Sequence, residues 1–149
     1  MNKRQKSILI NFVTVIVITT IAVIAMINFK DWVNHSEATR AMEQLGQEAI
    51  AYRKKHGSVP PESHISNVKE DLQGSARMGG LQYRARWIGF DPSPDEILAY
   101  IKRDYHSVFL GDGYIVLRLD GRVEWMGKKQ FETLLTEQQS PMEAEMTHK

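Results

Sequence analysis

Hydrophobic residues follow three patterns along the chain: an uninterrupted block, a helical stripe and short alternating runs. The block extends from Ile8 to Phe29, ILINFVTVIVITTIAVIAMINF, and contains no charge in 22 positions. At about 1.5 Å of rise per residue, a helix of this length crosses the roughly 30 Å hydrocarbon core of a bilayer. Trp32, just beyond the block, is typical of an interfacial anchor. The predicted membrane anchor therefore includes Ile8, Phe12, Ile16, Ile24, Phe29 and Trp32.

A cleaved signal peptide is the alternative interpretation of this block. The block is longer than the usual h-region of about 7–15 residues. The Ala22–Ala25 stretch is also not a clean small-residue cleavage site followed by a polar segment. Both features favour a retained transmembrane helix over 8–29.

The charges that flank the block predict its orientation. Lys3, Arg4 and Lys6 precede it without an acidic residue, whereas Lys30 and Asp31 after it cancel. The positive-inside rule then makes residues 1–7 a cytoplasmic basic tail and places the rest of the chain outside the cytoplasm. Without those three cations, the remaining chain has 16 basic and 18 acidic residues. This charge is no basic footprint, so nucleic acid is not an expected partner.

The helical stripe occupies residues 30–56 and predicts an amphipathic helix that continues from the membrane. Its apolar positions recur at spacings of three and four, and they are Ala38, Ala41, Met42, Leu45, Ala49 and Tyr52. A break at Asn34–Ser36 is possible. Gly57 and the following Pro60-Pro61 predict the end of the helix. If unbroken, residues 8–56 form a rod of roughly 70 Å.

Residues 57–137 are predicted to form a small β domain. Glycines punctuate 57–80 around a possible short helix at Val68–Gln73, and Leu81–Trp87 alternates as a half-buried strand does. The segment DPSPDEILAYIKRDYH is ambiguous. Ser93, Pro94 and Glu96 have the order of a helix capping box, whereas Ile97–Ile101 is short and apolar, as an inner strand would be.

The stretch GDGYIVLRLDGRVEWM predicts a β-hairpin. A two-residue turn at Asp120-Gly121 would mix apolar and charged residues on both faces. A three-residue loop, Leu119–Gly121, instead gives one apolar face. That register also sets Arg118 opposite Arg122, a like-charge pair that needs an acidic neighbour or solvent. The predicted sheet core is Ile115, Leu117, Val123 and Trp125.

A short helix is predicted at Lys128–Glu137, with Phe131, Leu134 and Leu135 on one face, and a frayed polar tail at 138–149. The predicted fold class is therefore α+β. A single N-terminal transmembrane helix, extended by an amphipathic helix, packs on a small antiparallel sheet, and a short C-terminal helix follows.

Two segments of the chain resemble the type IV pilins and the type II secretion pseudopilins. The first is the long apolar helix that ends in AIAYRKKHGSVP, since the first helix of this family ends in an aromatic residue, basic residues, Gly and Pro. The second is ILAYIKRDYHSVFLGDGYIVLRLDGRVEWMGKKQFETLL, which is similar to the C-terminal D-G-H-V-E hairpin signature of a planctomycete-type pseudopilin-like group. The resemblance covers about 8–56 and 97–135. It implies a pilin-like domain and favours a strand at Ile97–Ile101.

The chain also departs from the family pattern. It lacks the Gly-Phe-type prepilin cleavage site and the glutamate early in the apolar helix, and Arg122 stands where the group has His. These departures favour a second hypothesis, a free-standing bitopic membrane protein with a protein-binding module that does not polymerise.

Candidate chemistry is sparse. The chain has no cysteine, which excludes disulfides and thiol redox chemistry. Calcium is a possible cofactor through Asp112 with Asp104, or Asp91 with Asp95, but turn formation is the favoured explanation of these aspartates. His106 is expected in a loop, Trp87 and Trp125 are expected in the core, and the histidines have no paired metal spacing. No nucleophile turn is present, so no catalytic residue, cofactor-binding residue or metal ligand is predicted.

The sequence therefore predicts a non-enzymatic, membrane-anchored, pseudopilin-like structural subunit. The resemblance places it in the bacterial inner membrane, with a cytoplasmic N-terminus and a periplasmic domain. Its expected partners are membrane lipid and other copies or other pilin-like subunits. An extracytoplasmic enzyme or metal-dependent factor is the third, least favoured hypothesis.

Overall fold

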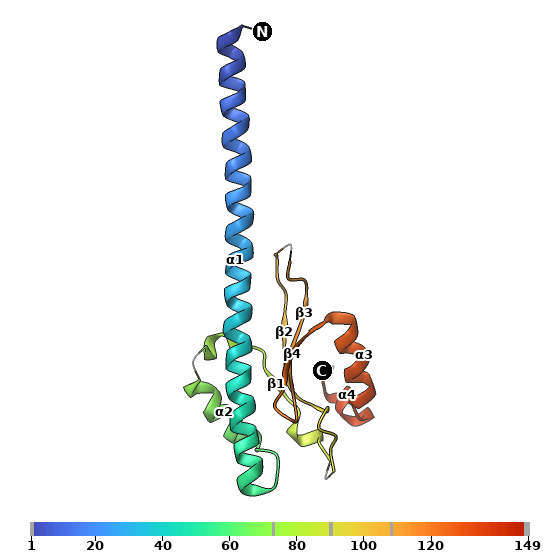
Figure 1. The fold of residues 1–149 in the computed structure, drawn as a ribbon. Helices are drawn as coiled ribbons and strands as arrows, with labels where there is room; N and C mark the ends of the chain where they lie inside the picture. Colours follow the sequence, from blue (N-terminus) through green and yellow to red (C-terminus); the bar gives the residue numbers. More distant parts are fainter. Residues whose placement is uncertain (1, 73, 90, 108, 148–149) are drawn as a thin grey trace.

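A single long helix dominates the structure, a computed structural model that describes residues 2–72, 74–89, 91–107 and 109–147. Helix α1 runs without interruption over Lys3–His56, so the possible break at Asn34–Ser36 does not occur. Its N-terminal half extends alone beyond the rest of the molecule (Figure 1). Gly57 ends the helix as predicted, with φ of 71° and its N–H bonded to the Arg53 carbonyl at 2.8 Å.

The segment after α1 is more helical than the sequence indicates. Helix α2 spans Glu62–Asp71 and begins directly after Pro61, well before the short helix expected at Val68–Gln73. A 3-10 turn, η1, follows at Ser75–Met78. Ile65 of α2 and Met78 of η1 are buried against α1, so this segment covers part of the long helix.

The strand expected over Leu81–Trp87 is wrong for most of its length. Strand β1 contains only Gln82–Tyr83, and a second 3-10 turn, η2, takes Ala85–Trp87. The cause is Arg84, which is buried and has a turned backbone with φ of −101° and ψ of 8°. The alternation of inward and outward side chains therefore ends at Arg84. Trp87, which was expected in the core, is half-buried beside a surface hollow.

The sheet is antiparallel throughout, with strand order β1-β2-β3-β4. Strand β2 spans Ile97–Arg103, β3 spans Gly113–Arg118 and β4 spans Val123–Gly127. The ambiguous segment is thus a strand. The capping-box residues form a tight turn instead, in which the Glu96 N–H bonds to the Ser93 carbonyl at 3.0 Å.

The β3–β4 hairpin has the predicted register. Ile115 pairs with Trp125 and Leu117 pairs with Val123, as the three-residue loop requires. Gly121 has φ of 89°, the left-handed conformation of a bulged hairpin. Arg118 and Arg122 are opposite each other and share a backbone hydrogen bond of 2.8 Å.

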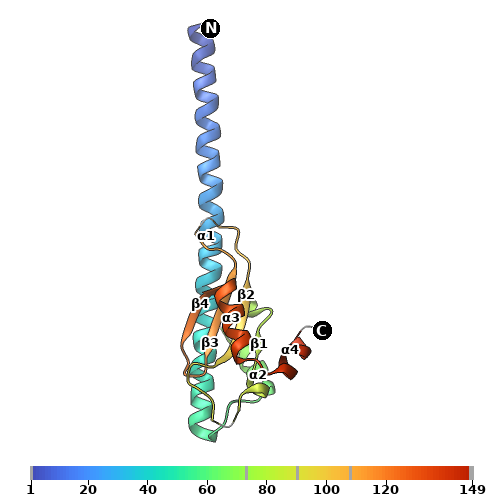
Figure 2. The same ribbon diagram turned by 90° about the vertical axis from the view of Figure 1, so that its right-hand side faces the viewer.

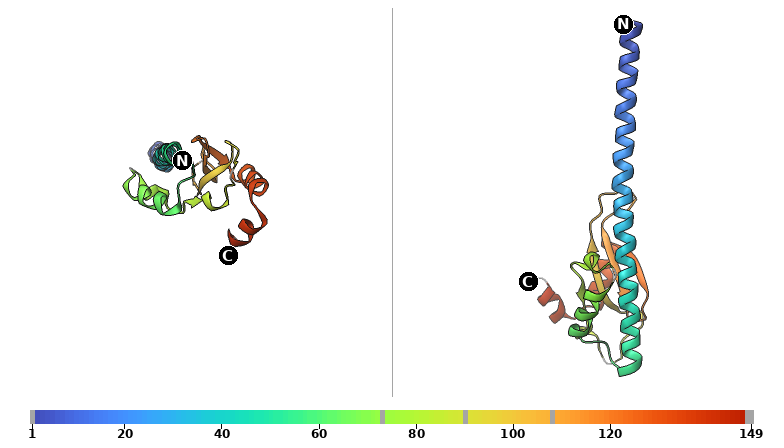
Figure 3. Two further views of the ribbon diagram at one scale, coloured as in Figure 1. Left: turned by 90° about the horizontal axis from the view of Figure 1, so that it is seen from below. Right: turned by 90° about the vertical axis from the view of Figure 1, so that its left-hand side faces the viewer.

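Helices cover both faces of the sheet. The C-terminal half of α1 packs on the face that contains the predicted sheet core, through Ala38, Met42 and Leu45. Helix α3, Lys128–Gln138, packs on the other face through Phe131, which contacts Tyr114 and Tyr100. The end-on view in Figure 3 shows the layer order α1, sheet, α3.

The expected frayed tail is also wrong for most of its length. Helix α4 spans Pro141–Thr147, and its Glu143 is buried. A polar composition predicts fraying only when no polar residue has a buried partner, and Arg84 supplies one here. The C-terminal segment is therefore part of the folded domain.

Candidate functional site

The N-terminal half of α1 carries most of the exposed large hydrophobic side chains of the described structure. Within the described residues, α1 is the one helix long and apolar enough to cross a membrane, and none of its most apolar 18-residue window is buried. A soluble domain of this size does not leave so many large side chains in water. All six predicted anchor residues are exposed on it: Ile8, Phe12, Ile16, Ile24, Phe29 and Trp32.

Polar side chains within this apolar segment bond back to the helix. The hydroxyls of Thr14 and Thr20 and the amide of Asn28 each donate to the carbonyl four residues earlier, at 2.9 Å. Such bonds reduce the cost of transferring polar groups into hydrocarbon. The segment is therefore compatible with a single membrane crossing.

The sheet meets α1 just beyond the apolar segment, at a set of residues that we call the junction. Asp31 is largely buried, and its carboxylate accepts the backbone N–H of His106 at 2.9 Å. One helical turn later, His35 lies edge-on to two aromatic rings, with ring centroids 5.8 Å from Tyr105 and 5.1 Å from Trp125. The junction consists of Asp31, His35, Tyr105, His106 and Trp125.

Burial sets the protonation states of the junction. Desolvation lowers the pKa of the His35 imidazole below its ordinary value. Desolvation likewise raises the pKa of the Tyr105 hydroxyl, which the charge of Arg103 lowers and that of Asp31 raises. The Tyr105 oxygen is 3.4 Å from Nδ1 of His35. The ring cluster is therefore uncharged near neutral pH, which suits a packed contact.

Gly113 makes this packing possible. A Cβ added at Gly113 would be 2.6 Å from the Trp125 ring and 2.4 Å from the Met126 carbonyl oxygen. The glycine lets the indole lie flat across the start of β3, where it reaches His35 and Tyr105. Trp125 thus packs against the core, at the end nearer the apolar segment of α1.

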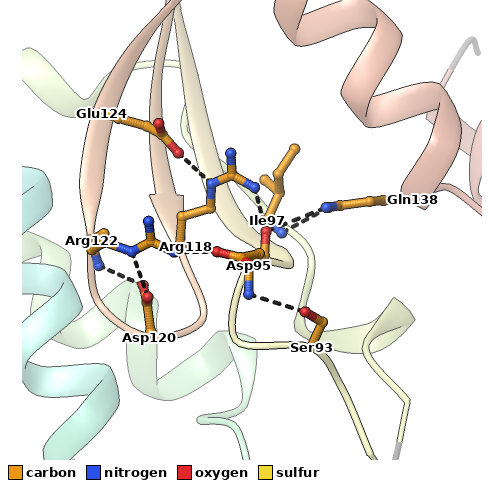
Figure 4. A network of polar contacts seen from close by, with 8 residues as sticks. All are labelled: Ser93, Asp95, Ile97, Arg118, Asp120, Arg122, Glu124 and Gln138. Atoms are coloured by element: carbon orange, nitrogen blue, oxygen red, sulfur yellow. Dashed lines mark hydrogen bonds and ion pairs between the residues drawn. The ribbon is translucent and has the colours of Figure 1, made fainter.

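The opposite end of the hairpin carries a network of polar contacts (Figure 4). Arg122 forms ion pairs with Asp120, at 2.5 Å, and with Asp95, and Arg118 pairs with Glu124. These acids offset the like-charge pair that the register creates. Burial raises the pKa of Asp120, but hydrogen bonds from the backbone and side chain of Arg122, with its charge, lower it overall.

Several aspartates that calcium would need are paired with cations instead. Asp95 and Asp120 pair with the Arg122 guanidinium, and Asp104 is 3.1 Å from the Lys102 ammonium. Among the described residues, no group of three or more His, Cys, Asp or Glu side chains could hold a metal ion. His106 is in an exposed loop between β2 and β3.

A buried ion pair that the sequence does not reveal fixes α4. The Arg84 guanidinium contacts both carboxylate oxygens of Glu143, at 2.6 and 2.9 Å, and both side chains are 3% exposed. Arg84 also donates to the carbonyls of Ile97 and Gln138. The paired residues are 59 positions apart, and no local pattern marks them.

No protein-family model, no curated protein and no solved structure matches this chain.

Proposed function

We propose that this protein is a membrane-anchored, non-enzymatic structural subunit similar to pseudopilins, which works by association with other subunits of a type II secretion or type IV pilus-like assembly. The observation that carries the proposal is the continuity of α1. The same helix provides the exposed apolar segment and, further on, the face on which the sheet packs. A subunit built in this way places its folded domain at a fixed position outside the lipid while the apolar halves of neighbouring copies pack within it.

The resemblance to pseudopilins supports the inner membrane of a bacterium as the location. The flanking charges support an N-terminus in the cytoplasm and a domain in the periplasm. The proposed partners are membrane lipid and other copies or pilin-like subunits.

Crosslinking in native membranes, followed by mild extraction, tests this proposal. A pilin-like subunit is expected to give a ladder of crosslinked copies or a defined hetero-complex. If the protein is recovered as a dispersed monomer under conditions that preserve other membrane complexes, the proposal is wrong.

The second candidate function is a free-standing bitopic membrane protein with a periplasmic protein-binding module. The observation that favours it is the lack of the usual cleavage site and helix glutamate in KSILINFVTV. The mass of the mature N-terminus distinguishes the two candidates. Loss of about the first seven residues supports pilin-type processing, whereas an intact Met1 supports an unprocessed anchor.

A further inference from the structure

The loop between β2 and β3, described over residues 104–107 and 109–112, presents the most exposed large hydrophobic side chain of the described structure. Phe109 is 83% exposed, more than any large apolar residue of the α1 segment. A single exposed apolar side chain is common on soluble proteins, so the significance of Phe109 depends on where its loop lies.

The loop lies at the end of the domain that faces the apolar half of α1. Figures 1 and 2 both show the β2–β3 connection as the part of the sheet that extends furthest along α1 towards its N-terminus. The Asp31–His106 hydrogen bond of 2.9 Å joins the loop to α1 at this level.

The junction sets the depth of the loop relative to a bilayer. Asp31 is two residues beyond Phe29, the end of the apolar block, which is about 3 Å along a helix. The headgroup layer on each side of the hydrocarbon core is roughly 5–8 Å thick. For a helix near the membrane normal, the Asp31–His106 contact therefore lies within the headgroup layer.

The turn that carries Phe109 is held by its own hydrogen bonds. The Ser107 hydroxyl oxygen accepts the Leu110 N–H at 2.8 Å. The charges beside the turn nearly balance, since Lys102 pairs with Asp104 and Asp112 lies on the other side. An apolar side chain on a weakly charged turn suits the headgroup–acyl boundary better than purely electrostatic attachment to anionic lipid.

We propose that the β2–β3 loop inserts Phe109 into the interface of the same bilayer that α1 crosses, as a second attachment point. One helix alone leaves the domain free to rotate about the helix axis. The second contact fixes which face of the domain is turned towards neighbouring proteins. This inference rests on the proposed membrane anchor.

Site-directed fluorescence in vesicles tests the inference with the full chain. The protein has no cysteine, so Phe109→Cys introduces a unique site for an environment-sensitive NBD label. The labelled protein is reconstituted in phosphatidylcholine–phosphatidylglycerol vesicles with and without a lipid that carries a nitroxide near the headgroup. Ile16→Cys reports on the anchor. Met142 on α4 is 63% exposed, so Met142→Cys is the matched control for an exposed apolar residue.

The expected result is blue-shifted emission at position 109 and quenching by the shallow nitroxide several-fold stronger than at position 142. This signal should persist at high salt and at low protein-to-lipid ratio. Blue-shifted emission at position 16, with neither a blue shift nor quenching at position 109, overturns the loop contact and leaves the anchor intact. Absence of a blue shift at both positions overturns the anchor as well. A blue shift at 109 that disappears on dilution into excess lipid, without nitroxide quenching, assigns Phe109 to a protein neighbour and also overturns the inference.

Discussion

At the scale of single residues, Gly121 is the position where the hairpin and the long helix constrain each other most closely. Its φ of 89° is in the left-handed region, and an added Cβ would be 2.3 Å from the Ile50 side chain of α1. Gly121→Ala therefore combines backbone strain with displacement of the flexible end of the Ile50 side chain. We expect a loss of roughly 1–3 kcal/mol in the free energy of unfolding, measured by denaturation in detergent micelles.

Gly57→Ala is the matched control for this substitution. Gly57 also has a positive φ, of 71°, but an added Cβ would meet nothing within 4 Å. Gly57→Ala therefore loses only about 1 kcal/mol, the cost of placing an alanine in the left-handed backbone conformation. Equal losses for the two variants would show that Ile50 moves aside at no cost and would contradict this prediction.

His35 gives the junction a dependence on pH. Because burial lowers its pKa in the folded protein, the unfolded chain takes up a proton first as the pH falls below about 6.5. The contribution of the neutral imidazole to the free energy of unfolding is therefore fully present above that pH. This contribution decreases as the pH falls towards the pKa of His35 in the folded protein. The thermal midpoint in detergent should therefore fall between about pH 7.5 and about pH 5.5.

His35→Phe should reduce this fall, since phenylalanine keeps an aromatic ring beside Trp125 and does not titrate. An unchanged pH dependence in His35→Phe would mean that other groups account for it.

At the scale of elements, the regular segments were predictable and the long-range polar contacts were not. The helical stripe predicts the α1 face that packs on the sheet, and the apolar face of GDGYIVLRLDGRVEWM predicts the β3–β4 register, because both depend on local periodicity. The Arg84–Glu143 and Asp31–His106 contacts join residues 59 and 75 positions apart. No pattern in the sequence around these residues indicates either contact. The sequence therefore predicts a longer strand than β1 and a frayed tail in place of α4.

The Arg84–Glu143 pair predicts how α4 is held. Glu143→Gln leaves the Arg84 guanidinium buried without its charged partner, and removal of one member of a buried pair costs about 3–5 kcal/mol. Helix α4 is short and has little apolar contact to replace this loss, since Met142 and Met146 are exposed. We expect the amides of α4 to lose their protection in hydrogen exchange.

Glu145→Gln, two residues away on the exposed side of α4, is the control and should retain protection. If α4 remains equally protected in Glu143→Gln, its docking depends on other contacts than this ion pair.

At the scale of the whole molecule, one uninterrupted helix joins the apolar segment to the folded domain. Sequence periodicity allowed a break at Asn34–Ser36, but the junction packs on this region and fixes Asp31 and His35 in one helix. Tertiary contacts thus decide a point that local propensity left open. The consequence is mechanical, because a rigid connection transmits the tilt of the apolar segment directly to the sheet.

Pulsed EPR distances between labels at Val23→Cys and Glu48→Cys test this rigidity in reconstituted full-length protein. Both positions are exposed on α1 and lie 25 residues apart, about 37 Å along a continuous helix. A narrow distance distribution is expected near that length. Ser36→Pro removes a helical hydrogen bond and should kink α1, which shortens and broadens the distribution, whereas Ser36→Ala should preserve it. A broad distribution in the parent pair would contradict a rigid α1, and with it the idea that the membrane segment sets the orientation of the sheet.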